Sequence, residues 1–155
     1  MTFQVSGLPV AQFQPLFGLP DHELAGLGVM RRFADAFPGF PCRVSLRDAE
    51  PGETLLLLNY EHLAVATPYR SRYAIYVREN ATAAALEPGE VPDVLRRRLL
   101  SLRAFRRDGM LQDCDVVEGR HIEPSIERLF AAPGVDYIHV HNAKAGCFAA
   151  RIDRL

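Results

Sequence analysis

Short apolar runs separated by turn residues make up most of the chain, and they predict a sheet. The clearest alternation lies in residues 73–80, where Tyr73, Ile75 and Val77 point to one face of an extended strand. Further apolar runs bounded by glycine or proline predict strands at residues 3–8, 42–46 and 54–63.

Two pairs of apolar runs in the second half of the chain predict hairpins. Residues 99–105 and 110–117 flank Asp108-Gly109, a dipeptide typical of a tight hairpin turn. Residues 136–141 and 147–153 form the last pair, joined by the turn sequence NAKAG.

Helical spacing is confined to three short segments. Leu24, Leu27, Met30 and Ala34 recur at helical intervals after Asp21, which predicts a capped amphipathic helix. Residues 87–98 are expected to hold a turn and one short helix, and residues 123–134 another short helix. Short adjacent strands with few long crossovers predict one α+β domain over residues 1–155, with a mainly antiparallel or mixed sheet and two or three short helices.

Composition argues against nucleic acid and membrane as partners. The chain has 155 residues, 24% of them charged, and a net charge of −1, so no global field attracts it to polyanions. The arginines at 96–98 and 106–107 are not interleaved with aromatic residues, and we expect them at the solvated ends of a helix and a hairpin. No apolar run approaches the roughly 18 residues of a membrane span.

The N-terminal segment and the cysteines predict a cytoplasmic location. No lysine or arginine precedes Arg31, so the chain lacks the basic region of a secretory signal. Cys42, Cys114 and Cys147 are odd in number and form no CxxC motif, which favours reduced thiols.

The last hairpin gathers the residues with the most chemistry. Alternation along two strands in simple register puts Ile138, Val140, Phe148, Ala150 and Ile152 on one apolar face. The opposite face would then carry Tyr137, His139, His141, Cys147 and Arg151.

Three interpretations of this hairpin remain open. His139 and His141 could bind a metal with Cys147 or His62 as third ligand, although HxH alone is a weak motif. Cys147 could be a nucleophile with His141 beside it. The third interpretation is structural, with the histidines bonded to their neighbours and Cys147 as a small apolar filler.

Arginines elsewhere in the chain are candidates for binding an anion. Arg43 follows a rigid Pro-Gly-Phe-Pro turn, and Tyr69-Arg70 lies on a loop that enters a strand. Arg103 lies in the middle of a strand and needs an acidic partner or a bound anion. The alternative is pairing with acids within the protein, for example Arg43 with Asp48.

Four blocks of the sequence together resemble a known family. These are PGFPCRVSLRDAEPGE, TPYRSRYAIYVRE, LLSLRAF and YIHVHNAKAGCFAARIDR. They are similar to the bacterial domain-of-unknown-function family 1203, over nearly the whole chain. The resemblance implies a small uncharacterised bacterial protein, and it implies no reaction, cofactor or substrate.

These observations lead to one hypothesis with two alternatives. We expect a pocket for a small ligand bearing a phosphate or carboxylate, with or without group-transfer or hydrolytic chemistry at Cys147 or His141. The ligand would be bound by Arg43, Tyr69, Arg70, Arg103, Asn142 and Arg151. The alternatives are a non-catalytic interaction module, compatible with a homodimer, in which the arginines pair with acids, and a small His/Cys metalloprotein. The sequence identifies no cofactor.

Overall fold

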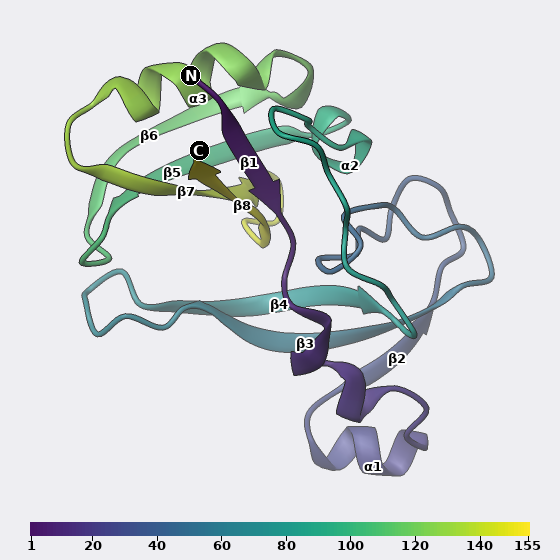
Figure 1. Cartoon of the computed structure of the whole chain (residues 1–155). Coiled ribbons are helices and arrows are strands. Elements are labelled where there is room, and N and C mark those ends of the chain that lie inside the picture. The colour runs from purple at the N-terminus through teal and green to yellow at the C-terminus, as the bar shows by residue number, and fades with distance from the viewer.

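Eight strands form two antiparallel sheets in the computed structural model, which describes residues 1–155 (Figure 1). The larger sheet has the strand order β1-β8-β7-β5-β6 and contains β1 (Phe3–Ser6), β5 (Leu99–Arg106), β6 (Leu111–Glu118), β7 (Val135–Asn142) and β8 (Phe148–Arg154). The smaller sheet has the order β2-β3-β4 and contains β2 (Met30–Phe33), β3 (Thr54–Leu63) and β4 (Ser71–Arg78). The predicted α+β class with a mainly antiparallel sheet is confirmed.

The helices are short, and one of them, α3 (Ile122–Ala131), packs as a layer against the larger sheet. The other two are α1 (Asp21–Gly26) and α2 (Asp93–Arg96), with 3-10 turns η1 (Val10–Gln12), η2 (Gln14–Leu16) and η3 (Gly119–His121). Figure 1 shows α3 along one side of the larger sheet, and the smaller sheet on the other side with α1 at its far end.

The two main apolar cores lie in different places. One core joins α3 to the larger sheet through Ile126, Phe130, Leu102 and Ile138. The other core packs the N-terminal segment against the smaller sheet through Phe13, Leu24, Leu56, Ile75 and Val77. The region between the sheets therefore holds little of the main cores, and polar residues occupy part of it.

The long N-terminal helix predicted from spacing is wrong after Gly26. The chain reverses at Gly28, whose φ of +74° favours glycine, and residues 30–33 then pair with β3 as an edge strand. Leu27 and Met30 are 63% and 52% exposed, so their spacing did not mark a buried helix face. Strand pairing with an apolar neighbour outweighed local helix propensity.

The strand predicted at residues 42–46 is also wrong. This segment is a turn that makes only isolated bridges, Pro41 with Asp48 and Cys42 with Tyr76. The Arg43 N–H donates to the carbonyl of Tyr76 on β4. The turn therefore attaches to the smaller sheet by single contacts, which leaves Arg43 free to point toward the larger sheet.

The simple register expected for the last hairpin is wrong at its turn end. His139 pairs with Arg151 and Val140 with Ala150 as alternation requires, but a bulge then sets His141 opposite Phe148. A bulge shifts the alternation by one residue. Phe148 consequently contacts the histidines, and Cys147 hydrogen-bonds Asn142 and lines a separate cavity.

Candidate functional site

Arg43 is a buried cation that no carboxylate neutralises. The residue is 2% exposed, its Nε donates to the Phe148 carbonyl at 2.7 Å, and its Nη1 donates to the Pro41 carbonyl at 2.5 Å. Burial lowers the pKa of the guanidinium, and the nearby Cys147 thiol opposes this effect. Arginine nevertheless stays protonated in proteins, so a positive charge lies inside the molecule.

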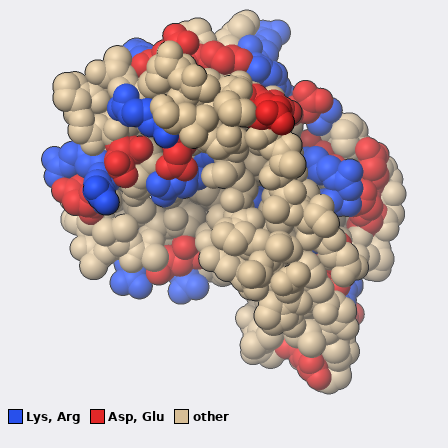
Figure 2. Space-filling view, in the orientation of Figure 1, with Lys and Arg blue, Asp and Glu red and all other residues tan.

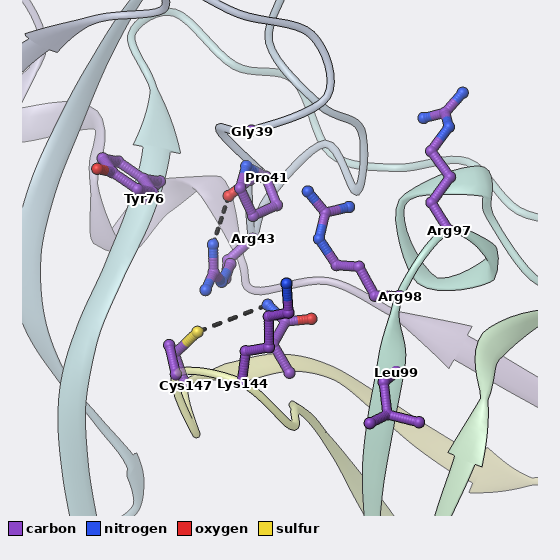
Figure 3. Close-up of a pocket in the computed structure, with 11 residues that line it drawn as sticks. Gly39, Pro41, Arg43, Tyr76, Arg97, Arg98, Leu99, Lys144 and Cys147 are labelled. Atoms are coloured by element: carbon purple, nitrogen blue, oxygen red, sulfur yellow. Dashed lines mark hydrogen bonds between the residues drawn. The ribbon is translucent and has the colours of Figure 1, made fainter.

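A cavity of about 390 Å³ opens beside Arg43. Its polar side chains come from four parts of the chain that are distant in sequence, and Figure 3 shows Arg98 and Lys144 extending toward the Pro41–Arg43 segment. The lining contains no Asp, Glu or His. It consists of Gly39, Pro41, Arg43, Tyr76, Arg97, Arg98, Leu99, Asn142, Lys144, Ala145 and Cys147.

Asp48 neutralises part of the positive charge around the cavity. Its fully buried carboxylate accepts hydrogen bonds from Arg98 at 2.6 and 3.0 Å and from Arg97 at 3.3 Å. Arg43 and Lys144 form no salt bridge. The alternative pairing of Arg43 with Asp48 is therefore absent, and the cavity keeps two uncompensated cations.

Asn142 and Cys147 meet on the cavity wall at the base of the last hairpin. The Asn142 amide nitrogen donates to the Cys147 sulfur at 3.5 Å, and the Asn142 backbone N–H donates to the Cys147 carbonyl at 2.9 Å. The side-chain oxygen of Asn142 is buried and has no hydrogen-bond partner. An unsatisfied buried acceptor beside a cavity is a polar group available to a ligand.

A second, smaller cavity of about 180 Å³ lies between the two sheets. Its polar lining is His62, Tyr69, Ser71, Arg103, His139 and His141. The three imidazoles are neighbours, with the His62 ring centroid 4.9 Å from that of His141 and 6.2 Å from that of His139.

Burial keeps these histidines neutral. It lowers the pKa of His139 to about 3, with the other two histidines and Arg151 and Arg103 adding to the effect. It also lowers the pKa of His141 to about 3, partly opposed by the hydrogen bond between His141 Nδ1 and the Gly146 carbonyl. The pKa of His62 is lowered by burial and by the charge of Arg103.

The candidate residues from the sequence therefore divide into three groups. Arg43, Asn142 and Cys147 line the larger cavity, while Tyr69, Arg103, His139 and His141 line the smaller one. The remaining two arginines are paired with acids.

Arg70 and Arg151 fit the alternative that the sequence left open, in which arginines pair with acids within the protein. The Arg70 guanidinium donates twice to Glu61, both times at 3.2 Å. Arg151 pairs with Asp153 at 2.8 Å and stacks on the Tyr137 ring at 4.1 Å.

The two residues proposed for catalysis, Cys147 and His141, face different cavities. His141 Nδ1 lies 2.8 Å from the Gly146 carbonyl oxygen, and the Cys147 thiol is bonded to Asn142. In the whole described chain, no group of three His, Cys, Asp or Glu side chains is arranged to hold a metal ion.

Sequence reasoning missed Arg97, Arg98, Lys144 and Tyr76 as lining residues. Arg97 and Arg98 were expected in solvent, but the α2–β5 junction places them against buried Asp48. Lys144 is the only lysine in the chain and lies in the turn of the last hairpin, which was the one available signal.

The outer surface mixes both signs of charge. Figure 2 shows basic and acidic side chains interspersed over one face, with a largely uncharged region toward α1. None of the helices has the length and apolar character that a membrane span requires.

The fold and the two cavities define a small α+β protein of two sheets, with a basic cavity beside a cysteine. The model of the family described as "Protein of unknown function (DUF1203)" matches residues 39–154, about three quarters of the chain, and the chain belongs to this family. No curated protein matches the chain, and no solved structure does. The matched residues include the lining of both cavities.

Proposed function

We propose that the protein binds a small organic anion, bearing a carboxylate or phosphate, in the cavity at Arg43. The observation that carries this proposal is the buried Arg43 guanidinium without a carboxylate partner. Leaving an ion unpaired in the interior costs several kcal/mol. A ligand that supplies the missing negative charge would offset that cost.

The remaining donors of Arg43 support the same conclusion. A guanidinium has five N–H groups, and two backbone carbonyls occupy one on Nε and one on Nη1. Apart from a donor directed at the Cys147 sulfur, the others are available for a planar carboxylate or a phosphate. Lys144 at the rim adds a second cation, and a volume of about 390 Å³ lies within the usual range of small-molecule sites.

Thiol chemistry is a second candidate function for the same cavity. Cys147 is the only nucleophilic sulfur on the wall, and the Asn142 amide positions it by donating to the sulfur. The lining offers no imidazole or carboxylate as a base. Reversible binding of an anion therefore has the stronger support, and group transfer through Cys147 would need the ligand or Lys144 to accept the proton.

Calorimetric titration at low ionic strength tests the binding proposal. Inorganic phosphate and a panel of small mono- and dicarboxylates are the probes. We expect at least one to bind, and Lys144→Met to weaken it about fivefold or more, because a unit charge at roughly 4 Å contributes about 1 kcal/mol even in water. Arg43→Lys should weaken it further, since lysine lacks the planar fork.

The matched control is Arg32→Gln on β2. Arg32 is exposed and forms no salt bridge, so its loss changes net charge by the same amount as Lys144→Met without touching the cavity. Equal weakening by both substitutions, or no binding of any probe to the unaltered protein at millimolar concentration, would contradict the proposal.

We also propose a cytoplasmic location. The three cysteines are all free, and Cys42 is buried among apolar side chains. Free thiols are typical of a reducing compartment.

A further inference from the structure

The second cavity is built from strands that belong to both sheets. Ser101, Arg103 and Phe105 on β5 pair directly with His141, His139 and Tyr137 on β7, so these side chains share the face that looks toward the smaller sheet. His62, Tyr69 and Ser71 complete the lining from β3, β4 and the loop between them. Nothing in the Arg43 proposal uses this cavity.

Two register shifts position the histidines. One bulge lies between Tyr60 and Leu63 on β3, next to His62, and another lies at His141 where β7 meets β8. Bulges turn a side chain away from regular alternation and are frequent beside binding sites. Here they bring three imidazoles from two sheets together in one buried place.

Arg103 supplies a charge that no acid neutralises. Its only protein partner is the Ser101 hydroxyl, to which Nε donates at 3.4 Å. The lining contains no Asp or Glu. The N–H groups on both Nη atoms of Arg103 therefore have no acceptor within the protein.

His139 adds an unsatisfied polar atom to the same cavity. It is 4% exposed, and its Nδ1 is buried without a hydrogen-bond partner. Leaving a buried polar group unpaired destabilises the folded protein. Such a group is available to a ligand that enters the cavity.

The charges around the cavity select an anion over a cation. Arg103 repels a metal ion, the donor set contains no carboxylate or thiolate, and the three imidazoles are not arranged for coordination. A neutral imidazole can present an N–H to an anion without carrying charge itself. A volume of about 180 Å³ admits only a compact ligand.

We propose that this second cavity is an independent site for a compact oxyanion, a phosphate or carboxylate group, bound by Arg103 with His139 as a neutral hydrogen-bond donor. Phe148 separates the two sites. Its carbonyl accepts from Arg43, while its ring stacks on His62 with centroids 5.6 Å apart.

Nitrogen-resolved NMR of the histidine side chains tests this site in the intact protein. Inorganic phosphate and acetate are titrated separately, so that the phosphate and carboxylate sources are distinguished. We expect at least one anion to shift the ring nitrogens of His139 and its neighbours His62 and His141, while exposed His22 and His121 stay unchanged.

Variants separate this site from the first one. Arg103→Gln should abolish the shifts, whereas Arg103→Lys should preserve part of them. Two control variants should leave the shifts intact. Arg107→Gln removes an exposed arginine that lies just beyond the same strand and forms no salt bridge, and Lys144→Met alters the other cavity.

Two results would overturn the proposal. One is the absence of shifts at His139 with both anions at tens of millimolar. The other is a response to Zn²⁺ alone, because a cation would then occupy the site. Failure of phosphate and carboxylates to bind at Arg43 leaves these readouts unaffected, since they report only on the histidines.

Discussion

Arginines of the same chain have different roles here because their neighbours differ. Arg70 and Arg151 each contact a carboxylate and are half-exposed, so they contribute little beyond a surface ion pair. Arg43 is buried among backbone carbonyls and a thiol, and Arg103 contacts only a hydroxyl. Of these four arginines, only Arg43 and Arg103 lack an acidic partner, and these two are suited to bind an external anion.

The charge near Cys147 leads to a prediction about its alkylation. Arg43 and Lys144 lie on its cavity wall with no acid in the lining. Around Cys114 the charges balance, with Asp113 and Asp115 beside Arg128 and with Arg103 opposite on β5. Iodoacetate is an anion and iodoacetamide is neutral, so a positive cavity favours the first reagent. The rate of alkylation by iodoacetate divided by the rate by iodoacetamide should be at least about fivefold higher at Cys147 than at Cys114. Using a ratio removes the effect of the lower accessibility of Cys147.

Mass spectrometry of the modified peptides measures both ratios in one sample. Lys144→Met should bring the Cys147 ratio closer to the Cys114 ratio, and Arg32→Gln should not. Equal ratios at the two thiols in the unaltered protein would argue against a positive cavity.

At the scale of elements, close packing at one junction sets the geometry of the larger cavity. The Gly119 N–H, at the start of η3, donates to the Arg98 carbonyl at 2.8 Å. An added Cβ at Gly119 would lie 1.8 Å from the Leu95 carbonyl oxygen at the end of α2. The position of Arg98 beside Asp48 therefore depends on a residue without a side chain.

Gly119→Ala should destabilise the protein by about 3 kcal/mol or more, because backbone must move to admit the methyl group. Gly26→Ala is the matched control. Its Cβ meets nothing within 4 Å, and Gly26 lies in α1, so alanine should be neutral or slightly stabilising. Urea denaturation of both variants measures the difference, and equal midpoints would show that the α2–η3 contact is not tight.

At the scale of the whole molecule, the main apolar cores lie outside the region where the histidines meet. Leu63, Phe105 and Tyr137 form only a small apolar cluster beside the smaller cavity. The three histidines and Arg103 occupy the adjacent space. Docking of the sheets at this end therefore depends on neutral imidazoles.

This arrangement predicts loss of stability in mild acid. The pKa of His139 and of His141 is about 3 in the folded protein against an ordinary value of 6.5. Between these values the unfolded chain binds protons that the folded chain does not, so stability falls as pH falls. The free energy of unfolding should drop on the order of 3 kcal/mol from about pH 7 to about pH 5.

Urea denaturation at a series of pH values checks this prediction. His139→Phe should roughly halve the loss, whereas His22→Gln, at an exposed position on α1, should leave it unchanged. Carboxylates whose pKa is lowered by arginine partners, such as Glu79 with Arg31, act only at lower pH. A flat profile between pH 7 and pH 5 would show that the histidines are not held neutral.

Local signals in the sequence were enough to determine most elements of the fold. Alternation and turn residues placed β3, β4, the β5–β6 hairpin and the last hairpin, because side-chain period and turn chemistry are properties of neighbouring residues. They failed at Met30–Phe33, where pairing with β3 decides the conformation. The same signals identified Arg43, Arg103, His139, His141, Asn142 and Cys147 as candidates.

The tertiary structure alone decided how those candidates are grouped. One bulge at His141 brought Phe148 to the histidines, and Cys147 lines the other cavity with Arg43. Asp48 pairs with Arg98, 50 residues away, instead of Arg43. Bulges and long-range ion pairs depend on contacts between segments far apart in sequence, so periodicity determined the strands here, and packing determined the two sites.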